Sequence, residues 1–361
     1  MIVCSSCQDP YPEGGVPFRC PACGGLYDFQ DHPPFQPDQV ERDLPGVWPY
    51  WHSFGYPVES APITLGEGNT PLVWGDVFGI RVGFKVESQN PTGSFKDRGT
   101  ALLVSFLRSR GITSAVEDSS GNAGSSFAAY AARAGLDARV YIPAYASGPK
   151  RVQIERYGAE IVAVPGPRSE AARAVKHAAE EGAVYASHAY LPHGLPGFST
   201  IAYELWEEMG EAPGSVVMPV GHGSLLLGIA RGFQALKAVG VISRMPALVG
   251  VQAQACAPLF KAYEKGKDKP VPVPEEETLA EGVRIQIPYR GKEVLNWVRE
   301  SQGRFVSVPE PEIKRGRERL AGLGLYVEWT SALVWDGLAQ VVGQVPEPVI
   351  AILTGHGLKN S

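Results

Sequence analysis

One lysine of this chain lies in a segment whose residue types suit covalent chemistry. The string from Asn90 to Gly99 reads NPTGSFKDRG, which places Lys96 after a predicted strand and at the start of a predicted helix. Partial burial and the positive end of a helix both favour the neutral amine, the form of lysine that attacks an aldehyde. The alternative is a surface lysine at a helix start. A phosphate loop of the GxxxxGK[ST] type is excluded, because the glycine spacing and the hydroxyl residue after lysine are both missing.

Three other segments lie where predicted strands end. Ser119-Ser120-Gly121-Asn122-Ala123 opens a predicted helix, and its backbone N–H groups are placed to hold a carboxylate. Segment 219–225 reads PVGHGSL and also joins a strand to a helix, so its amides suit a phosphate, with Ser224 adding a hydroxyl. Segment 353–359 reads LTGHGLK and ends the last predicted strand. Each segment also has a purely structural interpretation. An asparagine at a helix start such as Asn122, for example, is usually only a cap.

The first 23 residues hold four of the five cysteines, in two CxxC pairs made of Cys4, Cys7, Cys20 and Cys23. The stretch between the pairs is rich in proline and glycine and predicts a loop or hairpin. Four thiolates can surround one tetrahedral Zn²⁺ at about 2.3 Å, and they leave no open position, so the predicted zinc is structural. Disulfides, or a module that docks a protein or nucleic acid, are the alternatives. The fifth cysteine, Cys256, is predicted to be a buried thiol.

Taken together and in this order, these strings resemble the motifs of threonine synthases, within the tryptophan-synthase-β-like (fold type II) family of pyridoxal-phosphate enzymes. Segment 65–72, LGEGNTPL, and the N-terminal cysteine pairs resemble those enzymes as well. The resemblance covers nearly the whole chain. It implies an α/β fold of two doubly wound, mainly parallel-sheet domains with the cofactor between them, plus an N-terminal zinc ribbon.

The resemblance also implies a role for each segment. Lys96 would carry pyridoxal phosphate as an imine and, once displaced, remove the α-proton of a small amino acid as general base. Asn122 would bond the phenolic oxygen of the cofactor, and Ser119, Ser120, Gly121, Asn122 and Ala123 would hold the substrate carboxylate. Thr354 would face the pyridine nitrogen, where a neutral hydroxyl leaves that nitrogen largely unprotonated. The residues implied for the cofactor phosphate are Gly221, His222, Gly223, Ser224 and Leu225; most relatives have asparagine in place of His222.

Three positions depart from the pattern expected for the phosphate of O-phosphohomoserine. Ala123 replaces a hydroxyl residue, Leu225 an asparagine, and Gly194 an arginine. Losing a bidentate arginine and two polar donors weakens the binding of a dianion strongly. We therefore expect a threonine-synthase-like lyase whose substrate is left open between O-phosphohomoserine and an amino acid that lacks the phosphate. His188, His193 and Lys150 are candidate replacement cations, although each is more simply a surface or packing residue.

The predicted reaction is elimination of a β or γ leaving group followed by addition of water or hydrolysis. With O-phosphohomoserine the product would be threonine. The alternatives are a threonine or serine dehydratase and a β-replacement enzyme similar to cysteate synthases. A non-catalytic homologue that binds the cofactor and docks a partner through its ribbon is a further alternative.

Apolar periodicity supplies the elements that must position these residues. The predicted strands are 79–86, 113–117, 138–142, 160–164, 183–186, 215–220, 247–252 and 349–354. The predicted helices are 96–108, 122–134, 169–181, 200–209 and 224–239. This alternation predicts an α/β fold with a mainly parallel sheet. Segment 264–277 is predicted to be a surface excursion.

The predicted organisation is a zinc ribbon at 1–30, a surface linker at 31–56, a large cofactor domain from 57–85 and 201–361, and a small domain at 86–200. The net charge of −5 argues against nucleic acid as a main partner. No apolar run reaches the roughly 18 residues of a membrane span, and no signal peptide is recognisable. We expect a cytoplasmic protein, because paired cysteines suit a metal in a reducing compartment, and by resemblance a homodimer.

Overall fold

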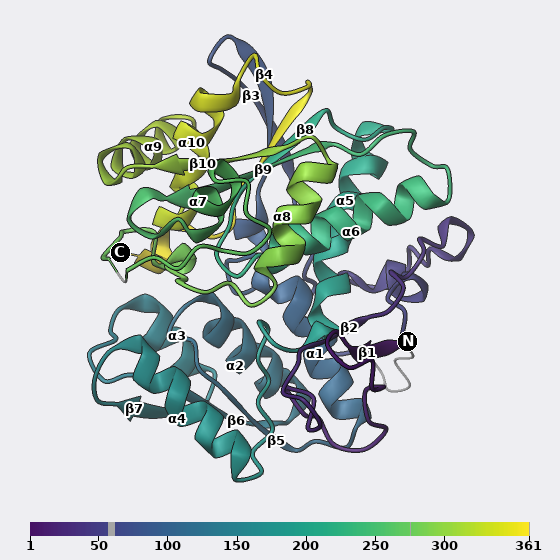
Figure 1. The fold of residues 1–361 in the computed structure, drawn as a ribbon, viewed down its shortest axis with the longest axis vertical. Coiled ribbons are helices and arrows are strands. Elements are labelled where there is room, and N and C mark those ends of the chain that lie inside the picture. The colour runs from purple at the N-terminus through teal and green to yellow at the C-terminus, as the bar shows by residue number, and fades with distance from the viewer. Residues whose placement is uncertain (57–61, 275, 361) are drawn as a thin grey trace. The chain divides into compact units, whose positions relative to one another are not determined.

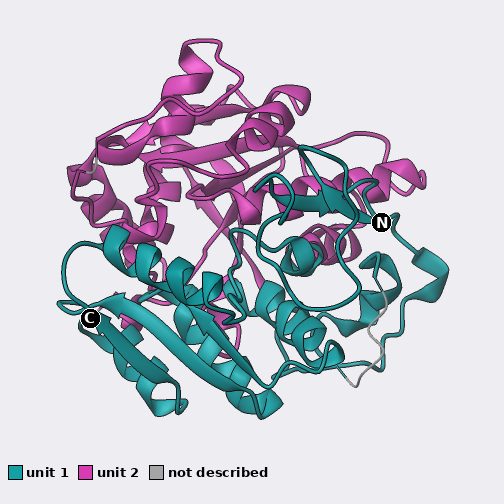
Figure 2. Ribbon diagram, turned by 60° about the horizontal axis from the view of Figure 1, so that its bottom comes forward, with its two compact units in different colours: residues 1–68, 96–197 teal, residues 69–95, 198–361 magenta. Residues whose placement is uncertain are grey.

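The computed structural model describes residues 1–56, 62–274 and 276–360, and the chain divides into two compact units (Figure 2). Unit 1 comprises residues 1–68 and 96–197, and unit 2 comprises residues 69–95 and 198–361. One of the three crossings between the units lies between Phe95 and Lys96. The boundary predicted after residue 56 falls at 57–61, outside the described residues.

Unit 1 is built on three parallel strands in the order β5-β6-β7. Its strands and helices, drawn in Figure 1, are β5 (Ser114–Glu117), β6 (Asp137–Pro143), β7 (Glu160–Val164), α1 (Lys96–Ser109), α2 (Asn122–Ala134), α3 (Pro149–Arg156) and α4 (Arg168–Glu180). α1 packs on α2, and α2 and α4 pack on β6. The loop after β5 leads directly into the first turn of α2. This loop lies at the edge of the sheet where the parallel strands end, which is where ligands bind in sheets of this kind.

Unit 2 holds a six-stranded mixed sheet in the order β10-β9-β8-β11-β4-β3, in which only β3 and β4 pair antiparallel among the described strands. The strands are β3 (Leu72–Val77), β4 (Ile80–Lys85), β8 (Ser215–Pro219), β9 (Ala247–Ala253), β10 (Arg304–Val308) and β11 (Val349–Ile352). The helices are α5 (Leu195–Met209), α6 (Ser224–Ala238), α7 (Pro258–Glu264), α8 (Gly291–Glu300), α9 (Glu310–Gly322) and α10 (Trp329–Val341); α5 begins in unit 1.

Both faces of this sheet are covered. All seven residues of β9 are buried, although the alternate residues Val249, Val251 and Ala253 already belong to the core shared with α9 and α10. Successive side chains of a strand point to opposite faces, so the remaining residues of β9 face a second layer. α6 and α8 supply that layer, since both contact β9. Continuous apolar strands of this kind are typical of parallel sheets buried on both sides, and the predicted α/β class is confirmed.

The N-terminal segment adds a short antiparallel pair, β1 (Ile2–Cys4) and β2 (Tyr27–Phe29). The following segment, predicted to be a surface linker, buries the side chains Phe35, Trp48, Tyr50 and Phe54, because large apolar rings gain more from burial than from solvent contact.

Several other predicted elements differ from the structure. Segment 183–186 pairs with β5 through one isolated bridge, Val116 to Tyr185, and does not form a strand. β3, β10 and the helices α3 and α7–α10 were not predicted. The expected surface excursion is confirmed for its described residues, which follow α7 and are largely exposed. No helix in the described part of the chain is long and apolar enough to cross a membrane.

Candidate active site

Lys96 is the first residue of α1, and the loop that leads into it is fixed by the end of the chain. Within unit 2, the Phe95 N–H donates to the Thr354 carbonyl at 3.0 Å and the His356 N–H donates to the Gly93 carbonyl at 3.0 Å. The buried Lys359 ammonium donates to the Thr92 carbonyl at 2.6 Å. Segment 353–359 therefore fixes the loop that precedes Lys96 through three hydrogen bonds.

A buried polar network, also within unit 2, reaches the start of the same loop at Asn90. Lys85, which is 1% exposed, donates to the Thr70 carbonyl at 2.6 Å and pairs with Glu204 at 2.9 Å. The Thr70 hydroxyl donates to Glu87 at 2.6 Å, and the amide nitrogen of Asn90 donates to the second Glu87 oxygen at 2.9 Å. These residues were not singled out from the sequence. Their signal was a lysine and a glutamate within and directly after an otherwise apolar predicted strand.

The loop Ser119 to Ala123 lies at the N-terminus of α2. Gly121 is the N-cap and supplies no side-chain oxygen, so the N–H groups of the first turn point out of the helix end. A Cβ at Gly124 would overlap the Ser119 carbonyl oxygen, which explains why position 124 is a glycine. Asn122 is the first residue of α2 and is half-buried. This helix end is suited to a carboxylate.

Ionisable groups gather beside this loop in unit 1. The Glu117 carboxylate is 1% exposed, accepts a hydrogen bond from the Ser119 N–H, and contacts Nδ1 of His188 at 3.2 Å. Burial raises the pKa of Glu117 to about 7, against the lowering effects of the Ser119 N–H and the charges of Lys96 and Arg168. Burial and the positive charge of Lys96 hold the pKa of His188 well below its usual range.

Asp118 completes this group. It accepts a hydrogen bond from the Tyr185 hydroxyl at 2.6 Å, and burial, with the neighbouring charge of Glu117, raises the pKa of Asp118. The candidate cation His188 thus binds a carboxylate of its own unit. Arg168, the first residue of α4, acts electrostatically on the whole cluster and was missed, because nothing in its local sequence marks it.

The segment 219–225 forms the turn between β8 and α6 in unit 2. Gly223 has φ +93°, a conformation that favours glycine, and a Cβ there would also overlap the Val294 side chain. α6 begins at Ser224 with a glycine N-cap, so its first N–H groups are again left to an anion. Leu225 is buried, and the His222 ring stacks on Tyr289 with centroids 5.0 Å apart.

Thr354 lies at the end of β11 and is 2% exposed. Its hydroxyl donates to Glu328 at 3.0 Å and lies 2.8 Å from the Ser331 hydroxyl. Glu328 is also 2% exposed and was not identified from the sequence, because it is 26 residues away.

These residues fit a pyridoxal phosphate group by their chemistry. A lysine at a helix start, two helix ends without a side-chain cap and a buried hydroxyl at Thr354 supply an amine, anion-binding amides and a partner for a ring atom. The Ser94 hydroxyl is fully buried and has no hydrogen-bond partner within the described residues. A polar ligand beside the lysine loop would satisfy it.

The positions expected to hold a substrate phosphate do not supply a cation. Gly194 is buried, and a Cβ there would lie 2.9 Å from the Gly99 carbonyl oxygen. His193 is 1% exposed and stacks on Phe106, with centroids 3.5 Å apart. The packing interpretation of His193 is therefore confirmed. The carbonyl of Lys150 accepts a hydrogen bond from Ser125 at 3.3 Å.

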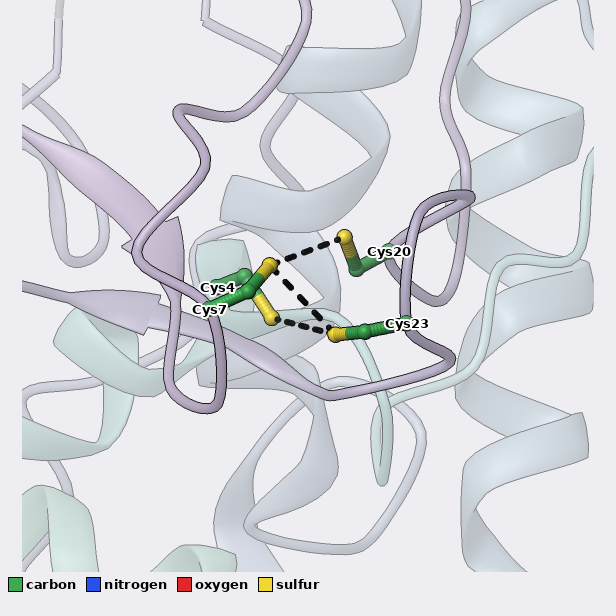
Figure 3. A group of neighbouring side chains, drawn as sticks. All are labelled: Cys4, Cys7, Cys20 and Cys23. Carbon is green, nitrogen blue, oxygen red and sulfur yellow. Dashed lines mark hydrogen bonds between the residues drawn. The ribbon is translucent and has the colours of Figure 1, made fainter.

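The four N-terminal cysteines converge on one point (Figure 3). All four sulfurs lie within 4.8 Å of one another, with Cys4 to Cys23 at 3.5 Å, Cys7 to Cys20 at 3.6 Å and Cys7 to Cys23 at 3.4 Å. A disulfide needs about 2.05 Å between sulfurs, whereas a tetrahedral site with bonds of about 2.3 Å separates them by about 3.8 Å. The cluster could therefore hold a metal ion. Cys256 is fully buried, as predicted.

The comparisons with known proteins agree with this site. The model of the family described as "Pyridoxal-phosphate dependent enzyme" matches residues 63–355. The chain belongs to this family. It is 33% identical to the threonine synthase of Methanosarcina acetivorans over 99% of this chain and 92% of that protein, and 32% identical to that of Methanocaldococcus jannaschii over the same shares.

Solved structures of related proteins share the fold. The structure of maize serine racemase is 22% identical, with a TM-score of 0.69 over 80% of this chain and 88% of that one. The tomato (Solanum lycopersicum) threonine deaminase isoform 2 is 20% identical, with a TM-score of 0.71 over 96% of this chain and 95% of that one. Both likenesses show the fold alone.

Proposed function

We propose that this chain is a threonine-synthase-like, pyridoxal-phosphate-dependent lyase acting on a small amino acid. The observation that carries the proposal is the placement of Lys96 at the first residue of α1, in the same unit as the carboxylate-binding end of α2. The charge of Lys96 acts on Glu117 and His188, which flank that loop. The family relatives named threonine synthase support the choice of reaction.

The proposed roles follow from the groups each residue offers. The turn Gly221, His222, Gly223, Ser224 and Leu225 would hold the cofactor phosphate at the start of α6. Lys96 is the proposed site of covalent attachment, Asn122 the partner of the phenolic oxygen and Thr354 the partner of the ring nitrogen. When bound, pyridoxal phosphate supplies a ring that stabilises negative charge at the α-carbon of an amino acid.

The chain's own residues then position and deprotonate the substrate. The first turn of α2, from Ser119 to Ala123, would fix the substrate carboxylate, and this orients the α-carbon. The Lys96 amine would take the α-proton, and the helix end around it favours the neutral amine needed for that step. His188, whose pKa is well below its usual range, stays neutral and adds no competing positive charge there.

A substrate that lacks the phosphate of O-phosphohomoserine is the alternative proposal. This proposal is supported by the Gly194 packing, in which a Cβ would lie 2.9 Å from the Gly99 carbonyl oxygen, and by the burial of His193 in an aromatic cluster. These observations support the alternative function, a threonine or serine dehydratase or a cysteate-synthase-like β-replacement enzyme, whereas the relatives named threonine synthase support the main proposal, formation of threonine from O-phosphohomoserine.

A substrate panel tests both levels of the proposal. The holoenzyme would be incubated with O-phosphohomoserine, O-phosphoserine, threonine and serine, and the products identified by mass spectrometry. The alternative function predicts turnover of threonine or serine to a keto acid and ammonia, and little or none of O-phosphohomoserine. Efficient threonine formation from O-phosphohomoserine would refute the alternative function and support the main proposal. No turnover of any amino acid by the cofactor-loaded protein would refute the lyase.

We further propose that the cysteine cluster binds structural Zn²⁺ as a ribbon at residues 1–30, since four thiolates leave no open position for chemistry. A site of four metal-binding thiolates suits a reducing compartment, and we propose a cytoplasmic location. The proposed assembly is a homodimer, with a cofactor domain at 57–85 and 201–361 and a small domain at 86–200. Light scattering of the purified protein tests the dimer.

A further inference from the structure

The loop between the two cysteine pairs, residues 8–19, which we call the cysteine loop, packs on two tyrosine rings of unit 1. The Phe18 ring meets Tyr185 and Tyr190 edge to face, with centroids 5.3 Å and 5.2 Å apart. The Arg19 guanidinium lies over the Tyr190 ring, 4.9 Å from its centroid, and donates to the Tyr190 hydroxyl at 3.2 Å. Tyr185 is 2% exposed and Tyr190 1%, so the loop packs on two buried rings.

The fold of the N-terminal segment fixes this end of the cysteine loop. Cys20, which directly follows Arg19, is 2% exposed and belongs to the group of four sulfurs that lie within 4.8 Å of one another. The Tyr11 hydroxyl donates to the Pro17 carbonyl at 3.2 Å, which closes the loop just before Phe18. Because both neighbours of the Phe18–Arg19 pair are fixed, the N-terminal segment determines where these two side chains lie.

Tyr185 joins the cysteine loop to the loop from Ser119 to Ala123, the proposed site of the substrate carboxylate. Its ring packs on Phe18, whereas its hydroxyl donates to Asp118, the residue before Ser119, at 2.6 Å. Burial and the charge of Asp118 raise the pKa of Tyr185 well above its usual range, so the hydroxyl keeps its proton and acts as the donor. One side chain thus contacts both the cysteine loop and the residue that leads into the carboxylate site.

The segment that carries this tyrosine makes further bonds to the same stretch. Two backbone hydrogen bonds, of 2.8 Å and 2.9 Å, join Val116 of β5 to residues 184–186. His188 Nδ1 lies 3.2 Å from one Glu117 oxygen, and the other Glu117 oxygen accepts a hydrogen bond from the Ser119 N–H. These bonds fix the backbone that runs from β5 to the carboxylate site.

The position of Ser119 is passed on to the helix end that would bind the carboxylate. The Ser119 hydroxyl oxygen accepts a hydrogen bond from the Gly121 N–H at 3.1 Å, and Gly121 is the N-cap of α2. The Ser119 carbonyl oxygen occupies the space that a Cβ at Gly124 would need, so it lies directly on the first turn of α2. A shift of Ser119 therefore displaces the N–H groups of that turn.

We propose that Tyr185 is a positioning residue through which the docked cysteine loop holds the substrate-carboxylate site in its binding geometry. This rests on the proposed function, which assigns the substrate carboxylate to the first turn of α2. Binding is tighter when the receiving N–H groups are fixed beforehand, because the substrate then does not have to order them. The N-terminal cysteine segment thereby contributes to substrate affinity without touching the substrate.

Hydrogen exchange measured by mass spectrometry reads the order of this site without turnover. Exchange of the backbone amides at residues 117–124 would be compared in the holoenzyme of the wild type, Tyr185→Phe and Phe18→Ala. We expect exchange about tenfold faster in each variant, because each loses one contact between the cysteine loop and Asp118. Tyr145→Phe, the same change at a tyrosine of unit 1 that is 64% exposed, is the matched control and should leave the exchange unchanged.

The double variant decides whether the Phe18 contact acts through the Tyr185 hydroxyl. Tyr185→Phe keeps the ring that packs on Phe18 and removes only the bond to Asp118. Adding Phe18→Ala to Tyr185→Phe should therefore speed the exchange by less than about twofold. A further tenfold increase, or an unchanged rate in Tyr185→Phe alone, would overturn the inference. If Phe18→Ala does not fold, Phe18→Leu, which keeps an apolar side chain but loses the ring, replaces it with the same expected result.

Steady-state kinetics with the amino acid identified by the substrate panel give an independent readout. Loosening a group that binds the substrate and the transition state alike raises KM and leaves kcat unchanged. Tyr185→Phe should therefore raise KM about tenfold at an unchanged kcat, and a fall in kcat at an unchanged KM would overturn the positioning role. If the wild type turns over no amino acid, the proposed function fails, while the exchange rates still decide whether Tyr185 orders the loop.

Discussion

Replacing Glu117 with glutamine should make the protein more stable relative to the wild type as the pH rises. Glu117 is a buried carboxylate whose pKa is about 7 in the folded protein, against an ordinary value of 4.5, and burial is the main cause. A carboxyl whose folded pKa is raised stabilises the folded state fully below its unfolded pKa, and this contribution is lost as the pH rises through the folded pKa. Glutamine resembles the protonated acid at every pH and does not suffer that loss.

The size of the effect follows from the two pKa values. The shift from 4.5 to about 7 corresponds to roughly 3 kcal/mol once the group is fully ionised, at about 1.4 kcal/mol for each pKa unit. Between about pH 5.5 and about pH 8.5, linkage gives a change of roughly 2 kcal/mol in the stability difference between Glu117→Gln and the wild type. The change favours the variant at the higher pH.

Urea unfolding of both proteins at several pH values measures this difference directly. Taking variant minus wild type removes the titration of groups that the two proteins share. The same substitution at Glu155, whose side chain is 47% exposed, reports the baseline effect of removing one surface carboxylate. A stability difference that stays constant, or that falls with rising pH, would show that burial does not govern the Glu117 carboxyl.

Three other changes test the supports of the site. Gly124→Ala should lower the free energy of unfolding by about 1–3 kcal/mol, because its Cβ would overlap the Ser119 carbonyl. Gly322→Ala, which has open space around it, is the control and should be neutral or stabilising. Equal changes in the free energy of unfolding of the two variants, measured by urea titration, would contradict this. Lys85→Met should destabilise by about 3–5 kcal/mol by leaving Glu204 buried without its cation, and adding Glu204→Gln should restore part of the loss; no restoration would refute the pairing. Cys20→Ser should reduce the zinc measured by atomic absorption and lower the melting temperature. An unchanged zinc content would show that the cysteine cluster is not the zinc site.

The sequence predicted the elements that carry the chemistry because their signals are local. Lys96, Asn122 and Ser224 each open the helix that was expected, since a strand, a glycine turn and an apolar helix follow one another within about 20 residues. Helices such as α9 were missed for a related reason. α9 exposes most of its surface and buries Gly316 against Ala332, so its apolar stripe is too weak to recognise.

The groups that tune the site could not be predicted, because distant segments bring them together. Glu117 contacts His188 across 71 positions and Thr354 contacts Glu328 across 26. His193 shows the converse. As a residue type it could bind an anion, but its contact with Phe106 makes it part of an aromatic cluster. Local patterns thus reveal where a site lies, and tertiary contacts decide which side chains face it.

Mapping the lysine that holds the cofactor tests the central claim most directly. The cofactor-loaded protein would be reduced with borohydride, digested with trypsin and analysed by mass spectrometry. Because a modified Lys96 resists cleavage, the adduct should appear on a peptide spanning residues 86–98, and Lys96→Ala should lose it. An adduct on any other lysine, or one that persists in Lys96→Ala, would contradict the account.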